Sequence, residues 1–387
     1  MKGPSTEVIH RAEGASRTAD PLTTPIYQTT TFLFESADEV RAYMEGRSDK
    51  FLYSRYRNPT VQSVEAKVAA LEGADAALVL ASGMAAVSTA LFGLVAAGDE
   101  VVCCSAIYGN TLRLLQGMFP RFGLTARFAT LEEFARPEDL IGPKTRVVWF
   151  ESPINPTLRC VDIAPIAAAC RRRNVVSIVD STFASPVNQR PLTFSVDLVM
   201  HSATKYLNGH SDVTAGVLAG SKALIDRIEP VRRLLGTVLD PQAAYALGRG
   251  LKTLIVRMAR HNASALAIAE WLEKDPRVTR VFYPGLASHP DHAIARKQMQ
   301  GFGGMVCVDL DGGIERASRF FDRLQVFKRA TSLGGVESLC SLPVHTSHWG
   351  YTDEQLERAG VTAGMARLSV GLEDVEDLIE DLDQALN

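Results

Sequence analysis

Residues 201–210 read His-Ser-Ala-Thr-Lys-Tyr-Leu-Asn-Gly-His, and this stretch decides the fold. It follows a mostly apolar run at 196–200 that is typical of a buried strand, so Lys205 is expected in a polar loop at a strand end. A lysine in this position can form a Schiff base with an aldehyde cofactor, and the hydroxyls of Ser202 and Thr204 are placed to hold a phosphate. A lone lysine with these neighbours also occurs in ordinary loops, so the surrounding sequence has to separate the two interpretations.

A second predicted strand, at 175–179, ends in Asp180. A buried aspartate can hold a pyridine nitrogen protonated, although Asp180 taken alone could equally cap a helix. Asp180 and Lys205, together with the two hydroxyls, are the residue types that pyridoxal phosphate chemistry requires.

The composition is that of an ordinary globular protein. The chain has 387 residues, 46% of them hydrophobic and 22% charged, and its formal net charge is −3. A charge so close to zero predicts no broad attraction to nucleic acid or to an anionic membrane.

Metal binding and disulfides are not expected. The six cysteines are scattered without a C-x-x-C pair, which favours reduced thiols in a cytoplasmic protein. The histidine pairs at 289/292 and 345/348 have no cysteine or acidic ligand pattern beside them, so no zinc site is predicted. No signal peptide is visible at the N-terminus.

Residues 76–97 are nearly all apolar, which a hydropathy scan could mistake for a membrane segment. Ser82 and Gly83 interrupt the run, and it lacks flanking basic clusters or aromatic anchors. We expect a strand at 76–80, a turn at Ser82 and Gly83, and a helix of small residues that ends at Gly98. Such a turn leaves backbone N–H groups free at a helix N-terminus, where a phosphate can bind.

The rest of the chain predicts an α/β protein with a mostly parallel sheet. Residues 1–57 are polar and irregular and are expected to form an N-terminal arm that needs another surface to order it. Residues 58–246 alternate apolar and helical runs and are expected to form a large domain. Residues 247–387 begin with a long helix and are expected to form a smaller α/β C-terminal domain. G-x-G-x-x-G and P-loop motifs are absent.

Seven motifs in this order give the chain a family resemblance. It resembles the pyridoxal-phosphate enzymes of cysteine and methionine metabolism, such as cystathionine γ-lyase, cystathionine γ-synthase, methionine γ-lyase and the homoserine-ester sulfhydrylases. The resemblance covers nearly the whole length. It is carried by Tyr53-Ser54-Arg55-Tyr56-Arg57-Asn58-Pro59-Thr60, Ser82-Gly83-Met84-Ala85-Ala86, Glu151-Ser152-Pro153-Ile154-Asn155-Pro156-Thr157, Val179-Asp180-Ser181-Thr182-Phe183-Ala184-Ser185-Pro186, the Lys205 stretch, Ser332-Leu333-Gly334-Gly335-Val336-Glu337-Ser338, and Arg367-Leu368-Ser369-Val370-Gly371.

This resemblance implies a pyridoxal-phosphate transferase fold of type I, like aspartate aminotransferase, and a homotetramer built as a dimer of dimers. It implies catalytic roles for Lys205, Tyr108 and Asp180. Lys205 would carry the cofactor and move protons, Asp180 would pair with the pyridine nitrogen, and Tyr108 would stack on the ring. Each of these residues also has a plain structural explanation when taken singly.

The same resemblance assigns the residues around the cofactor and the substrate. Tyr53 and Arg55 would reach the phosphate bound in a neighbouring subunit, which explains an arm without a core of its own. The phosphate in the same subunit would be held by Ser82, Gly83, Met84, Ser202 and Thr204, with Thr182 supporting the ring. The substrate carboxylate would be held by Asn155, Ser332 and Arg367, with Arg367 forming a two-pronged ion pair.

Two positions depart from subfamily patterns. Members that handle cystathionine often have a glutamate immediately before the Ser-Leu-Gly-Gly motif, where this chain has Thr331. Methionine γ-lyases often have a cysteine two residues after the stacking tyrosine, where this chain has Asn110. We favour γ-elimination of a sulfur amino acid such as cystathionine, methionine or homocysteine. γ-Replacement, as in a synthase or sulfhydrylase, remains the alternative, and a non-catalytic scaffold is a remote one because Lys205, Asp180 and Arg367 are all present.

Overall fold

The structure, a computed structural model, describes residues 3–11 and 21–387. Its larger sheet has the strand order β1-β7-β6-β5-β4-β2-β3. Only β7 runs against its neighbours, which makes the sheet mostly parallel as predicted. The strands are β1 (Ala76–Leu80), β2 (Glu100–Cys104), β3 (Thr125–Ala129), β4 (Thr145–Glu151), β5 (Val176–Asp180), β6 (Leu198–Ser202) and β7 (Gly216–Gly220).

The central strands are apolar because helices cover both faces of the sheet. Trp149 and Phe150 on β4 are completely buried. Because β4, β5 and β6 are parallel, their carboxyl ends meet at one edge, where Glu151, Asp180 and Ser202 end the three strands. Ligands of open α/β sheets bind at such an edge. The helices around this sheet are α3 (Pro59–Glu72), α4 (Gly83–Leu94), α5 (Gly109–Arg113), α6 (Leu131–Phe134), α7 (Ile163–Arg172), α8 (Ser185–Asn188), α9 (Lys222–Leu235) and α10 (Pro241–Leu251).

Helix α4 follows the predicted turn but ends earlier than expected. Ser82 caps it, with its hydroxyl accepting a hydrogen bond from the Ala85 N–H. The helix was expected to reach Gly98, and this is wrong because it ends at Leu94. The Asp99 carboxylate accepts a hydrogen bond from the Ala96 N–H at 2.8 Å, and this local turn competes with further helix.

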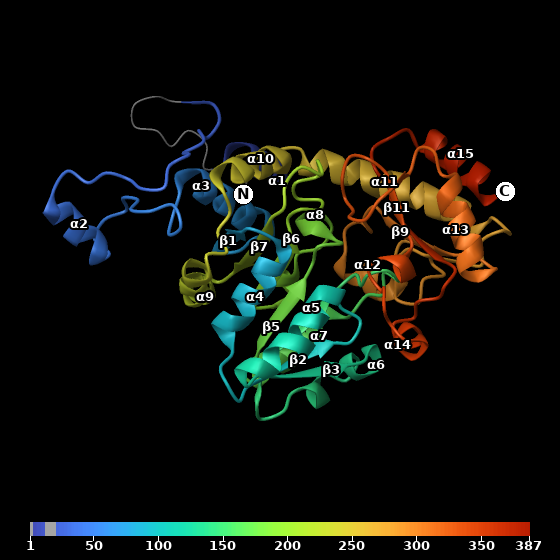
Figure 1. Cartoon of the computed structure of the whole chain (residues 1–387), viewed down its shortest axis with the longest axis horizontal. Coiled ribbons are helices and arrows are strands. Elements are labelled where there is room, and N and C mark those ends of the chain that lie inside the picture. Colours follow the sequence, from blue (N-terminus) through green and yellow to red (C-terminus); the bar gives the residue numbers. More distant parts are fainter. Residues whose placement is uncertain (1–2, 12–20) are drawn as a thin grey trace.

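The N-terminal arm contains two short helices, α1 (Pro4–His10) and α2 (Ala37–Met44), where the sequence predicted little regular structure. Helix α1 packs on α3 and buries Val8. Helix α2 buries no residue and lies away from the body of the chain, at the left in Figure 1. Part of the predicted arm, residues 1–2 and 12–20, lies outside the described residues.

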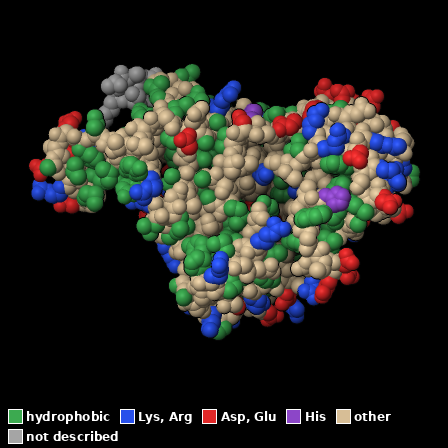
Figure 2. All heavy atoms as spheres, viewed as in Figure 1, with side chains coloured by type: hydrophobic (Ala, Val, Ile, Leu, Met, Phe, Trp, Pro, Cys, Tyr) green, Lys and Arg blue, Asp and Glu red, His purple; other side chains and the backbone are tan. Residues whose placement is uncertain are grey.

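The N-terminal arm projects from the body of the chain, and its surface is rich in apolar side chains. Figure 2 shows hydrophobic side chains gathered over it. The side chain of Leu33 is 91% exposed, and those of Leu22 and Met44 are also largely exposed. Over the described residues, no helix combines the length and the apolar character needed to cross a membrane.

The second sheet has the order β10-β11-β12-β9-β8. The single long helix predicted before it is in fact two helices, α10 and α11 (Leu254–Glu273), which meet at Lys252 and Thr253. Helix α10 spans the predicted boundary at 246/247, and the domain limits stay a prediction. The remaining elements are β8 (Arg280–Phe282), α12 (His292–Gln298), β9 (Met305–Asp309), α13 (Gly313–Arg323), β10 (Lys328–Arg329), β11 (Leu339–Ser341), α14 (Asp353–Arg358), β12 (Met365–Ser369) and α15 (Val375–Leu386).

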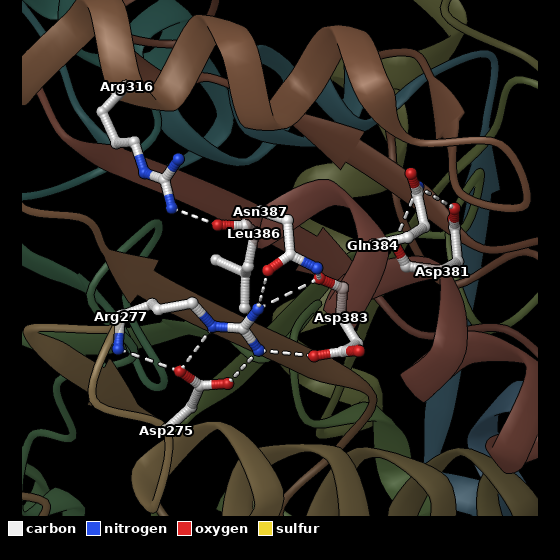
Figure 3. Close-up of polar contacts among 8 residues, drawn as sticks. All are labelled: Asp275, Arg277, Arg316, Asp381, Asp383, Gln384, Leu386 and Asn387. Carbon is white, nitrogen blue, oxygen red and sulfur yellow. Dashed lines mark hydrogen bonds and ion pairs between the residues drawn. The ribbon is translucent and has the colours of Figure 1, made fainter.

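The C-terminal helix α15 is fastened to this sheet by buried leucines and by one arginine. Leu378 and Leu382 are completely buried. Arg277 donates hydrogen bonds to Asp275 and to Asp383, both at 2.5 Å, and to the side-chain oxygen of Asn387 at 2.9 Å (Figure 3). The last residue of the chain is therefore held in place.

Candidate active site

A cavity of about 610 Å³ opens at the carboxyl ends of β4, β5 and β6. The second sheet contributes to it through β12 and the loop before β11. Thirteen of the residues singled out in the sequence line it. They are Ser82, Gly83, Met84, Tyr108, Asn155, Asp180, Thr182, Ser202, Thr204, Lys205, Thr331, Ser332 and Arg367.

Lys205 lies in the loop that follows β6, as the apolar run before it predicted. Its Nζ donates a hydrogen bond to the Ser332 hydroxyl at 2.7 Å. Burial, and then the charge of Arg367, lowers the pKa of Lys205 to about 8. A minor fraction of the amine, roughly a tenth, is therefore unprotonated at pH 7 and available as a nucleophile or a base.

The loop that carries Lys205 is held by Arg257 of α11, whose exposed fraction is only 4%. The Arg257 guanidinium donates hydrogen bonds to the carbonyl oxygens of Tyr206 and Gly250, both at 2.8 Å. Burial lowers its pKa to about 10. Gly209 makes room for this group: its φ is +76°, and a Cβ there would lie 2.1 Å from Arg257 Nη1.

Asp180 is fixed at the end of β5 by Thr182. The Thr182 N–H donates to the Asp180 carboxylate at 3.0 Å, and the Thr182 hydroxyl donates to the same oxygen at 2.5 Å. Burial raises the pKa of Asp180, while Thr182 and then His201 act against the rise. A protonated ring nitrogen in the cavity would supply the charge that this carboxylate needs to stay ionised.

The start of α4 forms the other wall of the cavity. Gly83 lies so close to β6 that a Cβ there would be 3.0 Å from Ser202 Cβ and Oγ. The first-turn N–H groups at Gly83 and Met84 have no intrahelical partners, which suits an anion. The Thr204 hydroxyl is already engaged, because it accepts from the Ala215 N–H at 3.0 Å and donates to the Ala215 oxygen at 3.2 Å.

Arg367 of β12 crosses from the second sheet into the cavity. Its Nη1 donates to Asn155 Oδ1 at 2.7 Å, and its Nη2 donates to the Ser332 carbonyl at 3.0 Å. Its side chain is buried, and its Nε has no hydrogen-bond partner among the described residues. A buried guanidinium with a spare donor fits a carboxylate. Ser332 adopts a φ of +88°, which is rare for a residue other than glycine and is typical of functional sites.

Tyr108 stands at the mouth of the cavity with 43% of its surface exposed. Its hydroxyl accepts a hydrogen bond from Asn110 Nδ2 at 2.9 Å, and Asn110 Oδ1 accepts one from Arg113 at 3.2 Å. Arginine can only donate, so its contact fixes which way the Asn110 amide points. The Tyr108 backbone N–H donates to Glu151 Oε1 at 2.6 Å.

Tyr53 and Arg55 do not line this cavity in the chain that bears them. The Arg55 guanidinium donates to the Arg233 carbonyl at 3.0 Å and lies over the rings of Tyr56 and Tyr53, at 5.0 and 5.4 Å from their centres. That Tyr53 and Arg55 reach the phosphate bound in a neighbouring subunit stays a prediction.

Two residues next to the site were not found by sequence reasoning. Arg257 lies within a long helix, where a single arginine gives no signal of burial. Glu151 was quoted only as part of a motif, without a role, although it lies 5% exposed at the end of β4. The sequence did contain a signal for a site residue at Glu151, because it ends an apolar strand as Asp180 does.

A mostly parallel sheet, with a half-buried lysine and a half-buried aspartate facing one cavity at its carboxyl edge, defines a pyridoxal-phosphate enzyme of fold type I. A family model described as "Cys/Met metabolism PLP-dependent enzyme" matches residues 5–387. A crystal structure of metB from Corynebacterium glutamicum superimposes with a TM-score of 0.93 at 37% identity, covering 100% of this chain and 98% of that one.

Characterised relatives extend the match at the sequence level. The chain is 43% identical to L-methionine gamma-lyase of Pseudomonas putida, over 100% of this chain and 98% of the relative. It is 41% identical to cystathionine gamma-synthase 1, chloroplastic, of Arabidopsis thaliana, over 98% of this chain and 68% of the relative. The chain therefore belongs to the family of pyridoxal-phosphate-dependent enzymes of cysteine and methionine metabolism, and pyridoxal phosphate is its cofactor.

The residues of the cavity fit this cofactor. Asp180 is a half-buried carboxylate at the cavity wall, held by Thr182, and a pyridinium N–H would supply it with a charged partner. At Gly83 the backbone N–H groups that start α4 line the cavity, and such groups suit a phosphate. Lys205 presents an amine with a lowered pKa between these two features.

Proposed function

We propose that the chain catalyses γ-elimination from a sulfur amino acid such as methionine, homocysteine or cystathionine, releasing a thiol, a 2-oxo acid and ammonia with the uptake of one water. The observation that carries this proposal is that Lys205 and the buried Arg367 line one cavity, with a lysine amine whose pKa is lowered to about 8. The methionine γ-lyase relative, which matches over the full length, supports the direction of the reaction.

The cofactor, when bound, supplies an electron sink that stabilises negative charge at the substrate Cα. Arg367 would bind the substrate carboxylate through its spare donors, and Asn155 holds the guanidinium at the right angle. This fixes the Cα–H bond relative to Lys205. The Lys205 amine would then take the Cα proton and pass protons to and from Cβ, because its pKa of about 8 suits both directions.

The remaining residues of the cavity orient Lys205, the cofactor and the substrate. Ser332 accepts a hydrogen bond from Lys205 Nζ, so it would hold the free amine close to the substrate. Asp180 would keep the ring nitrogen of the cofactor protonated, and Tyr108 would cover the ring at the cavity mouth. Tyr108 would also present its O–H to the departing γ-substituent, because its oxygen accepts from Asn110 and its own hydrogen is left to donate.

γ-Replacement is the second candidate, and the cystathionine γ-synthase relative favours it. The two outcomes share the same early proton transfers and differ in whether water or a thiol reaches the reacting carbon. The distal end of the cavity decides between them, and there the chain has Thr331 and Asn110 in place of the residues often found in the subfamilies. The scaffold alternative loses support because Lys205, Asp180 and Arg367 all face the cavity.

Product identification tests the proposal. Purified enzyme loaded with cofactor is incubated with methionine, homocysteine, cystathionine or an O-acyl-homoserine, with and without cysteine, and products are identified by mass. A 2-oxo acid formed without cysteine supports γ-elimination. Exclusive formation of a thioether, and only when cysteine is present, would establish γ-replacement. The control is Lys205→Ala enzyme, which should give neither product.

We further propose that the enzyme is a cytoplasmic homotetramer of two tight dimers. The arm supports this, because Leu33 and Met44 are exposed on a segment with no core of its own. The six cysteines are all free and buried, which suits a reducing compartment. Analytical ultracentrifugation of the native enzyme tests the assembly, and a species no larger than a monomer would refute it.

A further inference from the structure

Glu151 is a buried carboxyl group beside the half-buried Asp180. The two residues are partners in the pairing of β4 with β5, so their side chains leave the same face of the sheet. Both line the cavity. Only Asp180 has an evident task towards the cofactor, so the presence of Glu151 needs a separate explanation.

The contacts of Glu151 are those of a group that holds the backbone. Its Oε1 accepts a hydrogen bond from the Tyr108 N–H at 2.6 Å. No hydrogen bond to its Oε2 is found among the described residues, and Glu151 lines the cavity. Tyr108 begins helix α5, so this contact ties the end of β4 to the residue at the cavity mouth.

The charges around Glu151 disfavour an anion. From β5 it faces Asp180, from β2 the thiols of Cys103 and Cys104, and from the loop before α14 the hydroxyl of Tyr351. No lysine or arginine in the described part of the chain forms an ion pair with it. Burial, and then Asp180, raises the pKa of Glu151 well above its usual range, while the Tyr108 N–H only partly opposes this.

We propose that Glu151 is a neutral carboxylic acid that positions Tyr108 through its backbone N–H and leaves Asp180 as the only anion beside the cofactor's ring nitrogen. In this form its carbonyl oxygen accepts from Tyr108, and its O–H is a donor facing the cavity. Glu151 is thus a positioning residue. The proposal holds whichever γ-substituted amino acid the enzyme takes.

The pH dependence of apoenzyme stability tests the protonation state. A carboxyl whose pKa is raised on folding keeps its proton in the native state after the unfolded chain has lost its own, so its contribution to stability falls as pH rises above about 4.3. Glu151→Gln removes this titration and keeps the shape. The difference in unfolding free energy, Glu151→Gln minus wild type, should therefore grow from about pH 5 to about pH 9.

The control for this experiment is Glu138→Gln, whose carboxylate is exposed and pairs with Arg172. Its unfolding free energy should follow that of the wild type without such growth. A difference for Glu151→Gln that stays constant across the same pH range would overturn the proposal, because the native carboxyl would then titrate as in the unfolded chain.

Cofactor affinity of the apoenzyme tests the positioning role. Glutamine can accept from the Tyr108 N–H as the neutral acid does, so Glu151→Gln should bind pyridoxal phosphate within about threefold of wild type. Glu151→Ala loses the contact and should bind at least about tenfold more weakly, with an altered circular dichroism band of the bound cofactor. Equal weakening in both variants would show that an ionised carboxylate is needed, and unchanged binding by Glu151→Ala would remove the positioning role. If Glu151→Ala does not fold, the proposal is judged from Glu151→Gln alone, by its affinity for pyridoxal phosphate and by the pH dependence of its unfolding free energy.

Discussion

The Nζ of Lys205 lies 2.7 Å from the hydroxyl of Ser332, so the large sheet and the loop between β10 and β11 of the second sheet meet at the reacting amine. Ser332 adopts a φ of +88°, and Arg367 on β12 donates a hydrogen bond to its carbonyl oxygen. The geometry of the lysine therefore depends on both parts of the chain. Substitutions in either part should change catalysis.

Replacing Lys205 tests its role directly. Lys205→Ala should abolish turnover while the protein still folds and binds the cofactor through its phosphate, since the start of α4 is unchanged. Loss of a central acid–base or nucleophilic group costs orders of magnitude in rate. Turnover is measured by 2-oxo acid release, and activity above about one percent of wild type would refute the assignment.

The reactivity of Lys205 should depend on pH in a defined way. Its pKa is lowered to about 8, so the amine is protonated and inert below that pH and nucleophilic above it. The rate at which an amine-selective reagent modifies Lys205 in the apoenzyme should therefore rise to half its maximum near pH 8. The modified residue is identified by peptide mass. A midpoint near that of a free lysine, about 10.4, would contradict the prediction.

Arg367→Lys should weaken substrate binding. A lysine cannot hold Asn155, Ser332 and a substrate carboxylate at once, and each charge-assisted hydrogen bond contributes about 1.5–3 kcal/mol. We expect kcat/KM to fall by about tenfold to a hundredfold. The matched control is Arg358→Lys, whose side chain is exposed and pairs with Glu354. An unaltered kcat/KM in Arg367→Lys would place the carboxylate elsewhere.

Mixed subunits test whether the arm serves a neighbouring site. Arg55→Ala and Lys205→Ala proteins should each be inactive. If each site takes Arg55 from one subunit and Lys205 from the other, a hybrid dimer has one intact site and regains part of the activity. Activity is measured after subunit exchange, which is verified by mass with one protein isotopically labelled. Exchange without recovery would exclude the shared arrangement.

Thr331 should limit the preference for cystathionine. A hydroxyl cannot neutralise a distal ammonium, and a neutral hydrogen bond contributes about 1 kcal/mol against about 1.5–3 for a charged one. Thr331→Glu should shift the ratio of kcat/KM values for cystathionine over methionine by about tenfold. A wild-type preference for cystathionine of about a hundredfold or more would show that another group binds that ammonium.

The sequence predicted the strands that carry continuous apolar runs and the motifs that end them. Strand β1 begins and ends where expected. Strand β3 was missed because Thr125–Ala129 is half exposed at the sheet edge and lacks an apolar run. Strand β12 was missed because Arg367 interrupts it, and only the fold shows that this arginine is buried.

The cavity is predictable where motifs follow strand ends and unpredictable where distant elements meet. Asp180 and Lys205 come after apolar runs, so their positions follow from the parallel sheet. The contact of Arg257 with the Lys205 loop joins residues 51 apart in the chain at Tyr206 and depends on how α11 packs, which no local pattern encodes. The role of Arg55 depends on a second copy of the chain.

The packing of Gly209 against Arg257 also limits how this sequence can change. Any side chain at position 209 would overlap the Arg257 guanidinium and force it to move, and the φ of +76° adds strain for a residue other than glycine. Loss of Arg257 comes at a cost, because the carbonyls of Tyr206 and Gly250 then lack their buried donor. A single substitution at position 209 or 257 should therefore destabilise the lysine loop. Directed evolution at these positions will need paired changes rather than single steps.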